Sequence, residues 1–568
     1  MNAKTAMESV TMLRDPAVVM DPYRLGAMHQ TRLSFVRSLL RKMESEQWKI
    51  ECVQWDIATD GFGTAVYELK TPNGVYQLVV FSTAIADEER NDRVIAEKWD
   101  VTMALVKGRV NQRELDRLRQ NVPLQEAGRN TTQVLVLSRA NKSVRVFEHV
   151  IEALASGHQP NAKEIANVGY ILRTTAVYGN GKFGIADFET LDENPDFRLS
   201  FSAQMCAVYM LREFSLDWVH FLAKQKGGEC AITLKPELQR YIGVGNATGL
   251  GMAPYLIRHP RVVDNWLTHR EMALAAVSEQ PIDEDSTVRI LSLLNKARKH
   301  LKEVVTIDEH QQDLNARSVD ELPGLEQDIV MLSRDRSCWS AAVLAAEKYT
   351  FETQEILVTC LLEAFPEVVD PFCNEMNADE SLSLTPGVKV AAMLSLLETR
   401  YQWALSIDFS QPDSQYWFWY RSQDKEEPRM AVRGEEPGEE RELGLDVGRQ
   451  VSRFYESLKK ADPDMSLAEF LLENNAFRMI ARRVWTLGNC PMGDIQMNVL
   501  GKNVLPMHLL RCKLSMFGAT KFDPRSDRWV RVTLFQGAPT YAELGRVADI
   551  DSWLFPVLTS SNEQGETV

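Results

Sequence analysis

The chain has 568 residues, of which 45% are hydrophobic and 25% charged, and its formal net charge is −15. Single hydrophobic cores stop growing at roughly 250–300 residues, so we expect more than one domain. The hydrophobic content excludes an intrinsically disordered chain. The acidic balance argues against a nucleic-acid-binding protein, because phosphate neutralisation needs a basic surface.

Cysteine spacing and the apolar segments indicate where the protein resides. The eight cysteines are dispersed, and the closest two, Cys360 and Cys373, are thirteen residues apart, so the sequence has no CxxC motif. Residues 1–22 have no continuous apolar core, and the apolar stretch 205–222 carries several charged residues. We therefore predict a cytoplasmic protein with reduced thiols and no membrane partner.

Hydrophobic periodicity predicts the first elements. Apolar residues recur at helical spacing over 29–47, which predicts an amphipathic helix. Four strands are then expected, at 50–57, 64–69, 75–81 and 101–106. The second and third flank residues 71–74 (Thr-Pro-Asn-Gly), in which Asn-Gly is typical of a hairpin turn.

The remaining pattern is mainly helical. Helices are predicted at 111–120, 143–156 and 164–177, and residues 199–395 are expected to be mostly helical, with one helix starting at 285 or 286 and ending at 304. Acidic, weakly periodic stretches at 305–325 and 423–443 are predicted to be exposed loops, and the tail 559–568 is expected to fray.

An internal similarity suggests a duplication. Shifted by 340 positions, the hairpin at 64–82 lies without gaps over 404–422, with Pro72 over Pro412 and Tyr76 over Tyr416. A second similarity aligns Leu172-Arg173 with Leu510-Arg511 and Lys182 with Lys521. Chance similarity is the alternative, because each match alone is weak.

These observations together predict the fold class. We expect a helix-rich α+β protein with two possibly duplicated α+β units, each with an antiparallel sheet, joined by a mainly helical middle segment. The predicted domains are residues 1–198, 199–395 and 396–568. A cleft between related halves would be a suitable place for a pocket.

The loop at 178–184 is the first candidate site, because its three glycines let backbone N–H groups approach an anion. We predict that Lys182, Tyr178 and Asp187 supply acid–base chemistry. The predicted substrate-binding residues here are Arg173, Gly179, Asn180 and Gly181. The alternative is a glycine-rich turn with a surface lysine.

The second candidate is the glycine-rich stretch 243–251, which precedes a predicted helix and resembles an anion-binding loop. Asn246, Thr248 and Gly249, with Arg258 from the following helix, are the predicted contacts to substrate. A Rossmann domain is disfavoured because no alternating strand–helix series surrounds the stretch. A purely structural loop is the alternative.

Two further segments have a functional and a structural interpretation. The charged C-terminal segment combines cations and carboxylates, and an exposed ion-pair network is its alternative interpretation. Its charged residues are Arg511, Lys513, Lys521, Asp523, Arg525, Asp527 and Arg528. The aromatic run 416–421 is expected to be a strand covered on both faces, or an aromatic wall for a ligand.

The functional prediction follows from these segments. No metal motif, Walker loop or GxSxG elbow is present, so we predict metal-independent acid–base chemistry without a cofactor. The leading hypothesis is a cytosolic metabolic enzyme of lyase or isomerase type, acting on a small carboxylate or phosphate metabolite and possibly forming a homodimer. The alternative is a non-catalytic binding or scaffold protein that uses the duplicated units as an interaction surface.

Overall fold

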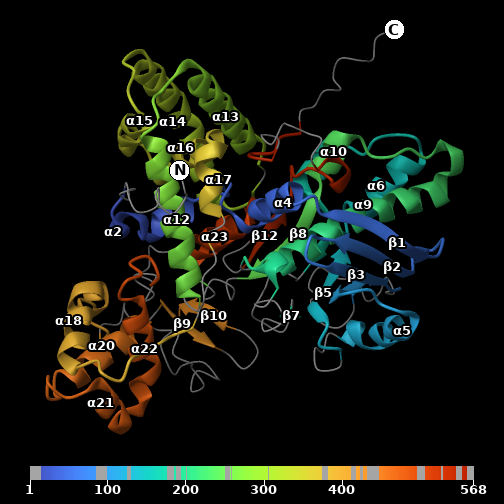
Figure 1. The fold of residues 1–568 in the computed structure, drawn as a ribbon. Coiled ribbons are helices and arrows are strands. Elements are labelled where there is room, and N and C mark those ends of the chain that lie inside the picture. The colour runs from blue at the N-terminus through green and yellow to red at the C-terminus, as the bar shows by residue number, and fades with distance from the viewer. Residues whose placement is uncertain are drawn as a thin grey trace. The chain divides into compact units, whose positions relative to one another are not determined.

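The chain divides into two compact units that alternate along the sequence (Figure 1). Unit 1 contains residues 1–29, 248–286 and 327–516, and unit 2 contains residues 30–247, 287–326 and 517–568. The computed structural model describes residues 14–84, 99–124, 130–174, 185–186, 194–199, 201–249, 256, 259–304, 306–373, 376, 381–410, 417–421, 426–430, 447–494, 506–525, 529–544 and 553–558.

Unit 2 is built on one mixed, mostly antiparallel sheet. The strand order is β1-β2-β3-β4-β5-β6-β8-β12-β11, and β7 pairs with β5 beside this path. The strands are β1 (Lys49–Ile57), β2 (Gly63–Lys70), β3 (Val75–Ser82), β4 (Val101–Lys107), β5 (Val134–Lys142), β6 (Tyr170–Thr174), β7 (Ile185–Ala186), β8 (Gly243–Gly249), β11 (Ala519–Pro524) and β12 (Trp529–Leu534). The four predicted N-terminal strands are confirmed, and β2 and β3 meet at the predicted turn, where the Thr71 N–H donates to the Gly74 carbonyl at 2.9 Å.

Helices cover both faces of the β2–β5 part of this sheet. On one face lies α9, which contacts α4, α6 and strands β4 to β6. On the other face, Leu115 and Leu118 of α5 pack against Val66, Val79 and Phe81. The α-helices of this unit are α4 (Phe35–Ser45), α5 (Gln112–Asn121), α6 (Phe147–Ala155), α7 (Ala162–Val168), α9 (Ser202–Gly227), α10 (Pro236–Tyr241) and, except for its first turn, α13 (Glu284–Glu303).

The parallel pair β6–β8 sits next to β12, and two glycines of β8 allow the close packing there. A β-carbon on Gly243 would lie 2.2 Å from the Leu534 carbonyl oxygen, and one on Gly245 would lie 2.4 Å from the Tyr170 ring. Neither distance is compatible with a side chain. Packing therefore accounts for these two glycines without a ligand.

Replacing Gly243 by alanine is expected to destabilise the protein by roughly 1–3 kcal/mol, because a backbone carbonyl must move to admit the methyl group. Chemical denaturation of the full chain measures this loss. Gly74→Ala is the matched control, because its β-carbon would meet nothing closer than 3.7 Å. Equal stability of both variants would contradict the packing explanation.

Unit 1 is mainly helical (Figure 1). Helix α12 contacts α15, α16 and α17, while α18, α20 and α22 contact one another. The α-helices are α2 (Pro16–Val19), α3 (Pro22–Ala27), α12 (Pro260–Ser278), α15 (Trp339–Ala345), α16 (Phe351–Ala364), α17 (Pro366–Cys373), α18 (Val390–Arg400), α19 (Gln402–Leu405), α20 (Val447–Leu458), α21 (Leu467–Glu473), α22 (Arg478–Leu487) and α23 (Pro506–Phe517). Strands β9 (Trp417–Arg421) and β10 (Glu426–Met430) form an antiparallel hairpin.

The predicted loop at 305–325 is wrong, because helix α14 (Glu309–Arg334) covers most of it and continues into unit 1. The Asp308 carboxylate accepts from the Gln311 N–H at 2.8 Å and so caps the helix start. Leu322, Leu325 and Ile329 form a fully buried stripe at helical spacing. Pro323 lies inside the helix, where sequence alone indicates a break.

Two other predicted segments change their secondary structure. The helix expected at 164–177 ends at Val168, because Gly169 adopts a left-handed cap with φ of 86° and strand β6 follows. The glycine-rich stretch predicted as a loop is strand β8 over residues 243–249.

The structure does not show the proposed duplication. Residues 402–405, at the start of the segment aligned with β2, form the short helix α19 rather than a strand. Residues 411–416, which include the second predicted turn, lie outside the described residues. The helix-rich α+β character is confirmed, while the three-part division of the sequence stays a prediction.

Among the described residues, none of the helices is both long enough and apolar enough to span a lipid bilayer.

Candidate functional site

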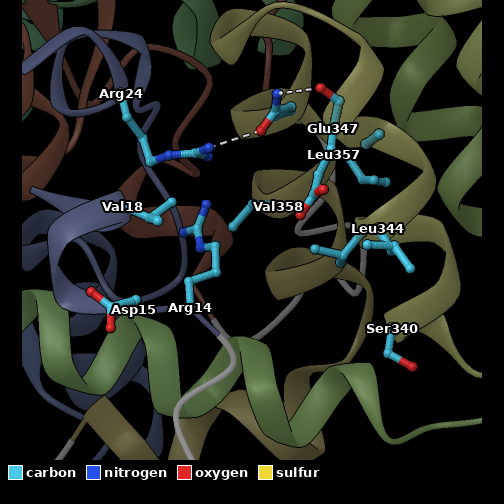
Figure 2. Close-up of a pocket in the computed structure, with 12 residues that line it drawn as sticks. Arg14, Asp15, Val18, Arg24, Ser340, Leu344, Glu347, Leu357 and Val358 are labelled. Carbon is cyan, nitrogen blue, oxygen red and sulfur yellow. Dashed lines mark hydrogen bonds between the residues drawn. The ribbon is translucent and has the colours of Figure 1, made fainter. Parts of the chain in front are cut away.

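A cavity of about 270 Å³ in unit 1 combines apolar walls with two arginines. Its lining residues are Arg14, Asp15, Val18, Arg24, Ser340, Val343, Leu344, Ala346, Glu347, Gln354, Leu357 and Val358. Figure 2 shows Arg14 and Arg24 extending their guanidinium groups toward one another, close to Val358. Small-molecule sites have this composition, with mostly apolar walls and a few convergent polar groups.

Four short stretches of chain place these side chains. Val18 comes from α2 and Arg24 from α3, and each helix begins with an Asp-Pro pair whose aspartate caps the first turn. Helix α16 supplies the buried Leu357 and Val358, and helix α15 supplies the exposed Leu344. The cavity therefore has a buried apolar wall and an open apolar rim.

Beneath the cavity, three arginines surround two buried glutamates. Glu355 accepts hydrogen bonds from Arg14 at 2.7 Å, Arg24 at 2.9 Å and Arg270 at 2.5 Å. Glu271 accepts from Arg14 through both carboxylate oxygens, at 2.7 and 2.5 Å. Both glutamates and Arg270 are fully buried. We call these five residues the buried charge cluster; it carries one excess positive charge.

The cluster fixes the protonation of its central carboxylate. Burial alone would raise the pKa of Glu355, but the charges of Arg14, Arg270 and Arg24 hold that pKa well below its ordinary value of 4.5. Glu355 is therefore ionised at neutral pH. Its charge holds the guanidinium groups of Arg14 and Arg24 at the cavity.

Two polar side chains hold Arg24 at the cavity. One terminal nitrogen donates to Glu355 and the other to the Gln354 side-chain oxygen at 2.9 Å, and the latter contact is drawn in Figure 2. Its buried Nε has no hydrogen-bond partner within the described part of the chain. The Gln354 amide in turn donates to the Glu347 carbonyl at 3.5 Å, which fixes its oxygen toward Arg24. The arrangement offers an oriented cation to an anionic group.

The structure describes four of the predicted substrate-binding residues. Arg173 lies in β6, half-buried, and Asn246 lies in β8, fully buried. Thr248 and Gly249 belong to the end of β8. Since β6 and β8 run parallel, with Arg173 paired to Gly245, both strands end at the same edge of the sheet.

The other predicted site residues lie outside the described part of the chain. They are Lys182, Tyr178, Asp187, Gly179, Asn180, Gly181 and Arg258. The acid–base roles predicted for Lys182, Tyr178 and Asp187 stay predictions.

The C-terminal charged segment is not an exposed network where it is described. Arg511 and Lys513 are buried in α23 of unit 1, and burial lowers the pKa of Lys513 to about 7. Lys521 and Asp523 are buried in unit 2. Asp527 and Arg528 lie outside the described residues, as do the side chains of the aromatic strand β9.

No sequence pattern indicates the cavity. The Asp-Pro pairs indicate helix starts near Arg14 and Arg24, but nothing connects these arginines with Glu355, more than three hundred positions away. The chain matches no protein-family model, and searches of curated proteins and of solved structures find no match.

Proposed function

We propose that unit 1 binds a small ligand that joins an anionic group, such as a carboxylate, to an apolar body. The observation that carries this proposal is the cavity itself, in which the guanidinium groups of Arg14 and Arg24 face the same space as Leu357 and Val358. Arginine recognises carboxylates through paired N–H donors, and apolar walls favour an apolar chain.

The cavity sets the size of the ligand. A volume of about 270 Å³ lies just below the roughly 300–1,000 Å³ of typical small-molecule pockets. A short-chain carboxylate is of a size that this space can hold. The ligand class agrees with the anionic metabolite expected from sequence, while the lyase or isomerase reaction stays a prediction.

Calorimetric titration with hexanoate tests the proposal on the full chain. We expect saturable binding of hexanoate and at least about tenfold weaker binding of hexanol, which has the chain without the charge.

Charge changes at the cavity rim are expected to move this affinity in both directions. Leu344 is 66% exposed at the rim, so Leu344→Asp should weaken hexanoate binding about three- to tenfold and Leu344→Lys should strengthen it. Leu472→Asp is the matched control, because Leu472 is 73% exposed on α21 and does not line the cavity. Equal weakening by Leu472→Asp, or binding that does not respond to either Leu344 variant, would overturn the proposal.

A further inference from the structure

Arginines of strands β6 and β12, and Arg525 directly after β11, lie on one face of the sheet of unit 2. Gly243 and Gly245 of β8 pair with Tyr170 and Arg173 of β6. Paired residues in neighbouring strands share a face, and residues two apart in a strand do so too. Tyr170 and Arg173 therefore lie on the same face, because a register shift between them adds one residue on β6.

Strands β12 and β11 extend this face. A β-carbon on Gly243 would lie 2.7 Å from the Thr533 side chain, so Thr533 of β12 is on the face of Gly243. Arg531, two residues earlier in β12, shares that face. Asp523 of β11 pairs with Arg531. One face thus carries Arg173 on β6, Arg531 on β12 and Asp523 on β11.

Tyr170 forms a buried floor between these side chains. Its ring lies over Gly245, where a β-carbon would approach it to 2.4 Å, and the residue is 5% exposed. Burial raises the pKa of Tyr170, while the positive charges of Arg531 and Arg173 oppose this rise.

Among the described residues of this face, the cations outnumber the carboxylates. Arg525, at the end of β11, donates to Asp523 Oδ2 at 3.1 Å. Within the described part of the chain, Arg173 and Arg531 form no ion pair with a carboxylate. We call Arg173, Arg525, Arg531, Asp523 and Tyr170 the arginine face.

Lys521, which pairs with Thr533 and is two residues from Asp523, lies on the same face, but its ammonium group is already engaged. Its ammonium group donates to the Ala166 and Asn167 carbonyl oxygens at 2.7 and 2.9 Å, at the end of α7. It therefore stabilises that helix terminus.

Asp523 adds a hydrogen-bond acceptor to the arginine face. The residue is fully buried, and its Oδ1 atom has no hydrogen-bond partner among the residues that the structure describes, although a buried carboxylate oxygen normally has one. A ligand held by the arginines that also carries an O–H group would satisfy this atom.

We propose that the arginine face binds an oxyanion that itself carries a proton, of which hydrogen phosphate is the simplest, with the three arginines donating to its oxygens and Asp523 accepting its O–H. Sulfate has the same shape but no proton at neutral pH, so it leaves Asp523 opposite an oxygen lone pair. The site discriminates between the two anions by this single hydrogen bond. It lies in unit 2 and is independent of the proposed cavity ligand in unit 1.

Calorimetric titration of the full chain with phosphate and with sulfate near neutral pH tests this site. We expect phosphate to bind at least about tenfold more tightly than sulfate, and Arg531→Gln to weaken phosphate binding at least about tenfold. Arg113→Gln is the control, since Arg113 is exposed on α5. Leu344→Asp should leave phosphate binding unchanged, and Arg531→Gln should leave hexanoate binding unchanged.

Asp523→Asn tests the discrimination itself. Its amide can donate to sulfate, so the preference for phosphate should fall to within about threefold while circular dichroism shows a folded chain. Equal binding of phosphate and sulfate by the wild-type protein, phosphate affinity unchanged in Arg531→Gln, or no phosphate binding would each overturn the proposal.

Discussion

Replacing Glu355 by glutamine is expected to destabilise the protein by about 3–5 kcal/mol, because it removes the charge on which three buried arginines converge. The remaining Glu271 cannot neutralise them all. Urea denaturation of the full chain measures the loss, and hydrogen exchange in α16 assigns it to unit 1.

An exposed ion pair in the same unit is the matched control. Lys389 and Asp464 lie 3.3 Å apart, with their side chains 58% and 87% exposed, so Asp464→Asn should cost less than about 1 kcal/mol. Adding Arg270→Met to Glu355→Gln should recover at least about 1 kcal/mol, because it removes one of the uncompensated cations. A cost below about 1 kcal/mol for Glu355→Gln would show that solvent reaches the buried charge cluster.

Glu355 is also expected to account for part of the stability that the protein loses at low pH. Burial favours the neutral acid, but the surrounding arginines prevail and lower the pKa of Glu355 in the folded state. Its stabilising contribution is therefore present above the unfolded-state pKa near 4.5 and is lost as the pH falls through the lower folded-state value. The Glu355→Gln variant should lack this part of the acid-induced loss.

Replacing Arg212 by methionine is expected to destabilise unit 2 by about 4 kcal/mol. This fully buried guanidinium donates to five backbone carbonyls, and charge-assisted bonds of this kind are worth roughly 1.5–3 kcal/mol each before relaxation. The acceptors are the carbonyl oxygens of Ile242, Pro539, Gln239, Arg240 and Ala538, at 2.7–3.1 Å. Methionine fills the space but removes all five of these hydrogen bonds, and among the described residues only the Arg240 and Pro539 carbonyls keep a further donor, the Gly537 N–H and the Tyr209 hydroxyl.

Hydrogen exchange identifies the segment that Arg212 holds. The Gly537 N–H donates to the Arg240 carbonyl, so this amide should exchange faster in Arg212→Met. Arg113→Met, at an exposed position of α5, should change the stability by less than about 0.5 kcal/mol. Unchanged exchange at Gly537 would show that the turn following β12 folds without the guanidinium.

Local signals predicted the elements that depend on local chemistry. Asn-Gly at 73–74 and alternating β-rich runs identified the hairpin β2–β3 and its neighbours. Strand β5 was not predicted, because its apolar run resembles that of a buried helix. Most of helix α14 was predicted to be a loop, because its sequence is acidic and weakly periodic and contains Pro323. Strand β8 was not predicted, because its glycines are required by close packing against Tyr170 and Leu534. These residues are distant in sequence, so no local pattern indicates the contact.

The candidate sites depend on contacts that no local pattern encodes. Arg173 was predicted as an anion ligand from its neighbouring loop, but its position opposite Gly245 follows from a parallel pairing between distant segments. The cavity residues Arg24 and Val358 are separated by more than three hundred positions. Sequence periodicity can identify each helix but not the partner against which it packs.

The alternation of the two units along the chain constrains synthesis and engineering. The chain passes between units five times, and unit 1 receives its last residues at position 516, before β11 and β12 exist. During translation, unit 1 can therefore be completed first, whereas the sheet of unit 2 waits for the last fifty residues. A gene fragment cut at any single position cannot encode either unit alone. An engineered variant that retains both units, such as a circular permutant, must therefore keep all of their segments in one chain.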